Sequence, residues 1–307
     1  NEYVIDPACG SAGFLVHVMQ WVWDHDLKHA EREPRIEYAQ EYLWGIDFED
    51  KAVKIARALM LVAGDGKSHV LKLNSLDPRE WMQSDLEKSD ARVKLSEMLS
   101  RFDDYEKNED NKGNFRFFNF DLLLTNPPFS GEIKQKELLK SYELARNKKG
   151  KIPNKVERDV LFIERDLNFL KPGGRMAIVL PQGKFNNTST EYIREYLFQK
   201  ARILAVVGLD TNTFKLPAPA KGTGTKTSIL FLQKWGKNEE QLEDYPIFMA
   251  TSQKTGKNNS GEYIYKKDEN GNYIENKDGQ KIVDHDLNEI AEGFVNFAKE
   301  QRFSFWR

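Results

Sequence analysis

Seven short apolar runs, each bounded by polar residues, alternate along most of the chain with segments of helical periodicity. Short continuous apolar runs are typical of strands that are buried on both faces of a sheet. The expected strands are 3–6, 43–48, 70–76, 121–125, 175–181, 203–209 and 227–233, and the expected helices between them are 14–28, 52–62, 160–170 and 190–199. This alternation predicts an α/β fold with a mostly parallel sheet. No helix separates the last two runs, so these two strands are expected to pair antiparallel.

The pattern changes after residue 235. Short alternating runs around Asn270-Gly271 and Asp278-Gly279 predict a small β-meander with tight turns, and helical spacing follows at 287–299. We therefore expect a main domain over residues 1–235 and a C-terminal extension over residues 236–307, made of the meander and the helix. No internal repeat is detected.

For two further segments the sequence predicts no helix or strand. Residues 78–118 are charged and irregular, which predicts a surface excursion. Aromatic residues at 303–306 follow the last helix. They are expected either to dock on a partner or to pack back on the core.

The composition is that of a globular protein, since 39% of the 307 residues are hydrophobic and 31% are charged. No apolar run reaches the ~18–20 residues that span a bilayer. The single Cys9 excludes an internal disulfide and fits a reducing, cytoplasmic location. The five His residues lack metal-ligand spacing, so no structural metal is expected. The net charge of −2 counts against a nucleic-acid binder unless basic residues gather on one face. The chain begins without Met, and we expect it to be part of a longer protein.

A glycine-containing loop joins the first expected strand to the first helix. Its pattern is Ala8-x-Gly10-x-x-Gly13, in which Gly10 suits a sharp turn and Gly13 a close backbone approach. Free N–H groups at the helix start suit an anionic or carbonyl group. The loop lacks the first glycine of the dinucleotide fingerprint, which argues against NAD and FAD. A plain strand-to-helix turn is the alternative. The candidate cofactor-binding residues here are Asp6, Pro7, Ala8, Gly10, Ser11, Gly13 and Phe14.

Two later strand ends add candidates for the same cofactor site. Asp47 closes the second strand, where a carboxylate can accept hydrogen bonds from both hydroxyls of a ribose, and Phe48 follows it. The alternative is that Asp47 caps the helix that starts near Asp50. Ser75 and Leu76 end the third strand, where the base of an adenosyl cofactor is expected.

The fourth run ends abruptly in Asn126-Pro127-Pro128-Phe129. Two prolines remove two N–H donors and leave a stiff platform at the carboxyl end of a strand, where open α/β sheets bind ligands. The amide oxygen of Asn126 and the carbonyl of Pro127 suit an exocyclic amine, and the Phe129 ring suits stacking on a base. Acceptors that draw the amine hydrogens free the lone pair of an adenine N6 for attack on an electrophile. These four residues are the predicted catalytic set, and Asn126 is also assigned to the cofactor site. The alternative is a proline-terminated loop with a capping Asn.

Basic residues gather in the stretch 130–158, which leaves directly from this platform. We expect either a solvated loop or a mobile loop that orders on contact with DNA phosphates. The candidate DNA-binding residues are Lys148, Lys149, Lys151, Lys184 and Phe214.

With these motifs in place, the sequence resembles the amino-group DNA methyltransferases that use S-adenosylmethionine. Among them it is similar to the modification (M) subunits of type I restriction–modification systems. Residues 6–14 match the family's cofactor loop, residues 126–129 its catalytic tetrapeptide, and Gly45-Ile46-Asp47 its acidic, ribose-binding strand end. The order of the first two motifs implies the adenine-N6 group, and the resemblance covers about residues 3–235.

The resemblance implies a Rossmann-like class I methyltransferase fold with seven strands, of which the last is antiparallel. It implies a site-specific, adenine-specific DNA methyltransferase that acts on a base flipped out of double-stranded DNA. It also implies a specificity (S) subunit and a restriction (R) subunit as partners, because no target-recognition domain of the usual size is present. The family's upstream helical domain is absent from this chain. The alternatives are the same fold acting on an RNA base or a protein glutamine, and a non-catalytic structural or cofactor-sensing module.

Overall fold

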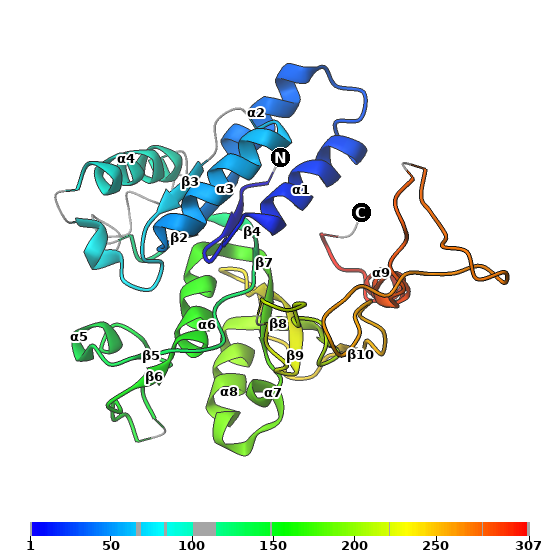
Figure 1. Ribbon diagram of the computed structural model, residues 1–307. Coiled ribbons are helices and arrows are strands. Elements are labelled where there is room, and N and C mark those ends of the chain that lie inside the picture. The colour runs from blue at the N-terminus through cyan, green and yellow to red at the C-terminus, as the bar shows by residue number, and fades with distance from the viewer. Residues whose placement is uncertain are drawn as a thin grey trace.

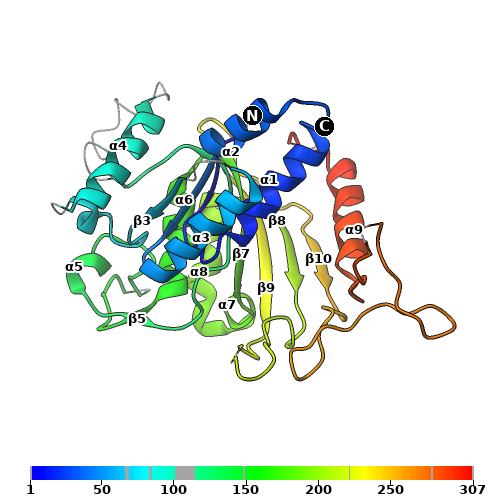
Figure 2. The same ribbon diagram turned by 45° about the horizontal axis from the view of Figure 1, so that its top comes forward.

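The computed structural model describes residues 2–65, 69–82, 85–100, 115–147, 149–220, 222–277 and 279–305. These residues form one eight-stranded sheet in the order β3-β2-β1-β4-β7-β9-β8-β10, and a two-stranded ribbon, β5-β6 (Figures 1 and 2). The strands of the sheet are β1 (Val4–Asp6), β2 (Leu43–Asp47), β3 (His69–Lys72), β4 (Phe120–Thr125), β7 (Leu170–Pro181), β8 (Ala201–Gly208), β9 (Thr227–Lys234) and β10 (Phe248–Thr251). The strands of the ribbon are β5 (Glu132–Ile133) and β6 (Val156–Glu157).

The α/β fold and seven of these strands are those that the sequence predicts. β9 runs antiparallel to both β7 and β8, which confirms the expected antiparallel pair. All other pairings in the sheet are parallel. The eighth strand, β10, belongs to the predicted C-terminal extension and pairs with β8 at the edge of the sheet. It was not predicted because four residues with alternating partial exposure make a weak sequence signal.

Helices cover both faces of the sheet. The helices are α1 (Gly13–His25), α2 (Arg32–Tyr42), α3 (Asp50–Ala63), α4 (Leu86–Ser100), α5 (Lys136–Leu139), α6 (Arg158–Phe169), α7 (Gly183–Asn186), α8 (Glu191–Lys200) and α9 (Leu287–Glu300). In β4, Leu122 contacts the core cluster of α1, α2 and α3, whereas its neighbour Leu123 belongs to the cluster of α4, α6 and α8. Figure 2 shows α1 and α3 in front of the sheet, and α6 and α8 behind it. The central strands are therefore buried on both faces, as their continuous apolar sequence requires.

Two helices lie where the sequence suggested irregular chain. α4 falls inside the stretch 78–118, so the expected surface excursion is wrong for residues 86–100, and residues 101–114 lie outside the described part. The apolar side chains that α4 buries are Ala91, Leu95, Met98 and Leu99. α2 lies between the expected helix 14–28 and the expected strand 43–48, where no element was predicted. Both helices carry many charged residues, which mask the few apolar positions that face the core.

The predicted meander is present as three short hairpins in residues 253–286, here called the C-terminal arm, which extends away from the sheet (Figure 1). Antiparallel bridges close the hairpins at Lys257–Tyr263, Lys267–Tyr273 and Glu275–Lys281. In each turn the side-chain oxygen of an Asn or Asp accepts the backbone N–H four residues later, and a glycine adopts a positive φ. The glycines are Gly261, Gly271 and Gly279. The expectation of no internal repeat is therefore wrong; unequal spacing conceals the repeat in the sequence.

The last helix and its aromatic end pack back on the sheet. Phe303, which is 4% exposed, clusters with Leu204 of β8 and Ala298 of α9. Phe231 of β9 stacks on Phe294 of α9, with ring centroids 6.0 Å apart. Of the two alternatives for the chain end, packing on the core is the one observed up to residue 305. The division at residue 235 stays a prediction, although β10 and α9 share the sheet and its core.

The central position of β1, between β2 and β4, sets up the functional site. The parallel pairing places Asp6 beside Gly45 in β2 and Ile5 beside Leu123 in β4. The carboxyl ends of β1, β2 and β4 therefore meet at one edge of the sheet. Among the described residues, no helix is long and apolar enough to cross a membrane, and no group of three or more His, Cys, Asp and Glu is arranged to hold a metal ion.

Candidate functional site

The loop after β1 lies at the carboxyl edge of the sheet, with Cys9 and Ala12 buried and Ser11 and Gly13 exposed. Gly10 has a φ of 52° and Ala12 a φ of 64°, so the backbone passes twice through the left-handed region before α1 begins. The N–H of Gly10 donates to Oδ2 of Asp47 at 3.0 Å, which ties the loop to β2. A Cβ on Gly10 or Gly13 would meet no atom within 4 Å. The loop therefore leaves space in which a ligand can approach the backbone closely. The predicted residues Ser11 and Phe14 are exposed beside this space.

Asp47 ends β2 and braces this loop. Its Oδ2 accepts from Gly10, and its Oδ1 accepts from the N–H of Glu49 at 2.9 Å. The N-cap of α3 is Glu49, and no side chain caps this helix, so the alternative that Asp47 is a helix cap is wrong. A carboxylate has about four acceptor positions, and two backbone N–H groups leave the others for hydroxyl donors. Phe48 is 57% exposed next to Asp47 and offers an apolar face.

Asp6 joins the predicted cofactor loop to β4, the strand that precedes the predicted catalytic residues. Its Oδ1 accepts from the Oγ1 of Thr125 at 2.8 Å and from the N–H of Ala8 at 3.1 Å. Thr125 is fully buried and directly precedes Asn126. Burial raises the pKa of the Asp6 carboxyl from 3.8 to about 7, although the hydrogen bonds from Thr125 and Ala8 oppose this. A group that titrates near neutral pH thus lies at the junction of the two motifs.

The raised pKa of Asp6 predicts a pH dependence of stability. The folded state holds the Asp6 proton up to about pH 7, whereas the unfolded chain releases it near pH 3.8. The contribution of Asp6 to the free energy of unfolding is therefore fully present below pH 3.8. It is lost as the pH rises towards 7, by up to about 1.4 kcal/mol per pH unit. Asp6→Asn should remove this loss. Urea unfolding of both proteins between pH 4.5 and 8 measures the difference, and parallel pH profiles would contradict the assignment.

Ser75 and Leu76, in the segment after β3, make hydrogen bonds that stabilise the candidate site. The hydroxyl of Ser75 donates to the carbonyl of Pro7 at 2.6 Å, and the hydroxyl of Tyr142 donates to the carbonyl of Leu76 at 2.7 Å. Both residues are buried. Ser75 thus ties the segment after β3 to the predicted cofactor loop, and Leu76 ties it to Tyr142. Asp77 is a further acid here that the sequence analysis did not name. It is 3% exposed and bound by the guanidinium of Arg79; its position after the third strand was the available signal.

The predicted catalytic tetrapeptide, residues 126–129, lies at the same edge of the sheet. Asn126 is exposed directly after the buried Thr125, whereas Pro127 is buried and Phe129 is half-buried. The ring of Phe129 packs edge-to-face on that of Phe214, with centroids 5.7 Å apart and an interplanar angle of 81°. The structure therefore brings Phe214 to the tetrapeptide, a contact that the sequence could not reveal.

The candidate basic residues have different surroundings. Lys149 and Lys151 are exposed near the tip of the basic stretch, and both of their backbone N–H groups bond to Oδ1 of Asn147. Lys148 lies outside the described residues. Lys184 is buried, with its ammonium in ion pairs with Glu157 and Asp159. These carboxylates argue against a direct phosphate contact of Lys184, which instead joins α7 to the start of α6.

The basic stretch is anchored at both ends rather than loose throughout. The ribbon of β5 and β6 closes its base, where Lys155 pairs with Glu132 at 2.7 Å. The buried Leu138 and Leu139 of α5 attach it to the core. Beyond these anchors, Lys149 and Ser189 both line a groove of about 660 Å³ between the stretch and the start of α8. The stretch thus contains a short helix, α5, that was not predicted, and its tip stays a predicted site of phosphate contact.

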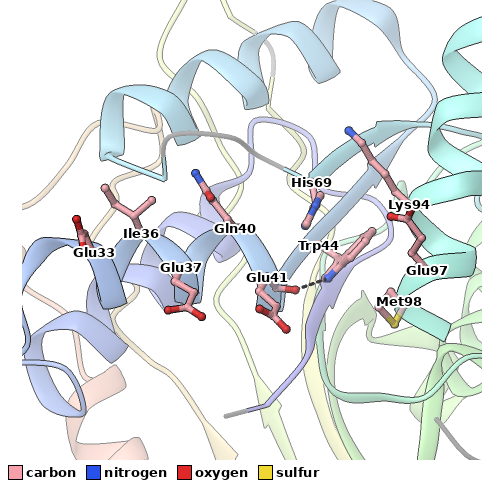
Figure 3. A pocket seen from close by; sticks show the side chains of 10 residues that line it. All are labelled: Glu33, Ile36, Glu37, Gln40, Glu41, Trp44, His69, Lys94, Glu97 and Met98. Carbon is pink, nitrogen blue, oxygen red and sulfur yellow. Dashed lines mark hydrogen bonds between the residues drawn. The ribbon is translucent and has the colours of Figure 1, made fainter. Parts of the chain in front are cut away.

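A second cavity, of about 440 Å³, lies towards the opposite edge of the sheet, where β2 and β3 begin (Figure 3). Trp44 and His69 stack in its wall with ring centroids 4.0 Å apart, and the indole N–H of Trp44 donates to the carbonyl of Glu41. Its charged lining residues are Glu33, Glu37, Glu41, Glu97 and Lys94. The excess of carboxylates makes this cavity unsuitable for nucleic-acid phosphates, and it contains none of the predicted site residues.

Comparison with known proteins identifies the family of the chain. The N-6 DNA Methylase family model matches residues 1–305. The chain is 24% identical over 243 residues to the type II restriction enzyme and methyltransferase RM.BcgI of Heyndrickxia coagulans, covering 78% of this chain and 29% of that protein. It is 23% identical over 241 residues to the type I restriction enzyme EcoEI methylase subunit of Escherichia coli, covering 78% and 39%. The chain thus spans less than half the length of either relative.

A solved structure agrees in fold. A Listeria monocytogenes protein assigned to the class I S-adenosylmethionine-dependent methyltransferases superposes with a TM-score of 0.51 at 18% identity, covering 82% of this chain and 58% of that one. The strand order, the loop after β1 and the tetrapeptide after β4 thus occur together in a class I methyltransferase fold. With the family match over nearly the whole chain, the protein belongs to the N-6 DNA methylase family.

Proposed function

We propose that this chain is the methyl-transferring part of a site-specific DNA adenine-N6 methyltransferase, and that it acts as the M subunit of a type I restriction–modification system. The main observation in support of this proposal is the hydrogen bond between Asp6 and Thr125. It joins the strand of the cofactor loop to the strand of the catalytic tetrapeptide, so that a cofactor at Asp47 and a base at Asn126 approach each other at one edge of the sheet. Such an arrangement lowers the barrier mainly by positioning.

The cofactor-side residues fit S-adenosylmethionine. The open backbone at Gly10 and Gly13 gives room for the ligand, and Asp47 retains acceptor positions for ribose hydroxyls. Phe48 provides an exposed apolar face beside that acceptor. When bound, S-adenosylmethionine supplies an electrophilic methyl group on a sulfonium.

The substrate-side residues prepare the adenine amine. Asn126 and the carbonyl of Pro127 accept its two hydrogens, which localises the lone pair on N6 for in-line attack. Phe129, oriented by Phe214, stacks on the flipped base. After transfer, the extra proton on nitrogen leaves to water, so the scheme needs no general base.

The partners proposed are double-stranded DNA and the S and R subunits. A net charge of −2 supplies little phosphate affinity, so partner surfaces would provide most of it. The EcoEI relative is named as a subunit of a type I enzyme, which supports assembly with other chains. The rival substrates, an RNA base and a protein glutamine, present similar amines or amides.

The test is the destination of the methyl group. The full-length protein with its partner subunits is incubated with tritiated S-adenosylmethionine, duplex DNA, RNA and cell protein. Label in DNA is the expected result. Label in RNA or protein, or none in any fraction, would overturn the proposed function.

The groove beside the basic stretch yields a prediction about DNA affinity. Lys149→Gln together with Lys151→Gln should reduce the slope of log affinity against log salt concentration by about 2, if each lysine neutralises one phosphate. Lys28→Gln with Lys299→Gln is the matched control, because these exposed lysines follow the far end of α1 and close α9, at the opposite edge of the sheet. An unchanged slope in the first variant would favour the alternative, that the stretch is a solvated loop without phosphate contacts.

A further inference from the structure

The loop between β8 and β9 carries the ring that orients Phe129. We call residues 211–226 the aromatic loop, of which all but residue 221 are described. It folds back on itself, since the N–H of Thr223 donates to the carbonyl of Phe214 at 3.1 Å. Phe214 then meets Phe129 edge-to-face. The orientation of the stacking ring thus depends on where this surface loop is held.

The first hairpin of the C-terminal arm holds the aromatic loop directly after Phe214. The ammonium of Lys257 donates to the carbonyl of Lys215 at 2.9 Å. Gly261 packs against the same backbone, because a Cβ there would lie 2.7 Å from the carbonyl carbon of Leu216 and 2.8 Å from its nitrogen. Only a glycine permits this approach, since real Cβ atoms do not come so near to backbone atoms.

The arm is itself attached to the sheet. Asp286, just before α9, accepts from the hydroxyl of Ser252 at 2.6 Å and from the N–H of Gln253 at 2.7 Å. Ser252 directly follows β10. The contacts thus run from the sheet through the arm to the aromatic loop and the catalytic ring.

The second and third hairpins repeat the geometry of the first without this contact. Gly271 and Gly279 have φ values of 85° and 75°, close to the 84° of Gly261, yet a Cβ on either would meet nothing within 4 Å. Lys267 lies over the ring of Tyr273 as Lys257 lies over that of Tyr263. The repeat therefore contains internal controls that share the local turn and differ in their contact with the loop.

From this arrangement we infer that Lys257 and Gly261 are positioning residues for the target base. They hold the aromatic loop so that Phe214 keeps Phe129 in the plane on which the base stacks. The inference rests on the proposed function for its substrate, but the contact that it describes is independent of the reaction. A segment that looks like a surface appendage in the sequence thus contributes to the site.

The experiment compares Gly261→Ala with Gly271→Ala in the full-length complex. Both substitutions place alanine at a positive φ and incur the same local strain, but only the first displaces the backbone of Leu216. Hydrogen exchange of peptides covering residues 211–220 should become faster in Gly261→Ala alone. For methylation of unmodified plasmid DNA, kcat/KM should fall by about tenfold or more in the same variant, as expected for a misplaced contact group. The affinity for S-adenosylmethionine should stay unchanged in both.

Lys257→Met and Lys267→Met form a second pair, which leaves the backbone intact and keeps the test valid if Gly261→Ala does not fold. The Lys257 variant should show the faster exchange, and the Lys267 variant should match the wild type. Equal exchange and equal kcat/KM within each pair would overturn the inference. A further outcome is that the wild type transfers no methyl to DNA while exchange still differs within the pairs. This result would contradict the proposed function but support the role of Lys257 and Gly261 in holding the aromatic loop.

Discussion

Asn126→Ala is expected to lower the rate of methyl transfer by about 10²–10³, while leaving cofactor and DNA binding within about twofold of the wild type. The residue is exposed at the end of a strand whose last side chain, Thr125, is fully buried. Its loss should therefore leave the fold intact and remove one acceptor for the adenine amine. Removing one preorganised polar group from a transition state typically costs 10²–10³ in kcat. Single-turnover methylation by the complete complex measures the effect.

Two variants show whether this loss is specific. Asn238→Ala removes an exposed amide from a turn after β9 and should have wild-type activity. Asn126→Asp keeps an acceptor but adds a charge, and it should retain partial activity, lowered by the desolvation of a carboxylate next to the base. Full activity in Asn126→Ala would show that the reaction does not depend on this amide.

Asp47→Ala should weaken S-adenosylmethionine binding by about 1.5–3 kcal/mol, the range for hydrogen bonds to a charged group. Two effects combine here. The ribose hydroxyls lose their acceptor, and the N–H of Gly10 loses the oxygen that holds the cofactor loop. Calorimetry should record a drop in affinity of about 10- to 150-fold.

Glu49→Ala is the matched control for Asp47, because it removes an exposed carboxylate two residues away. Its affinity should remain near that of the wild type, since only its backbone N–H bonds to Asp47. Equal losses in both variants would mean that general negative charge, rather than Asp47, attracts the cofactor. Tight binding of NAD by the wild type would contradict the cofactor assignment itself.

The sheet could be predicted from the sequence because its order follows local signals. Each central strand is a short apolar run, and the missing helix before Thr227 marks the antiparallel pair. α2 and α4 were missed because their buried residues are few and lie among charges. β10 was missed because a four-residue edge strand depends on its partner β8 more than on its own sequence.

The local geometry of the two predicted motifs could also be inferred from the sequence, since glycine and proline restrict the backbone. The contacts between distant segments could not be. The pairing of Lys184 with two acids, the bond from Ser75 to Pro7 and the contact of Phe214 with Phe129 all join residues that no local pattern relates. The same holds for Gly261, whose turn reads like that of Gly271 although only one of them touches the aromatic loop.

We propose that the loop after β1 and the tetrapeptide after β4 form one site for the amine of adenine, and this proposal can be tested by measurement. It is tested most directly by nucleoside mass spectrometry of DNA from a methylation-free host, after incubation with the full-length complex and S-adenosylmethionine. We expect N6-methyladenine in the wild-type reaction and a yield lower by about a hundredfold or more with Asn126→Ala. Methyl groups on cytosine, or DNA without any modified nucleoside from a complex that binds both ligands, would contradict it.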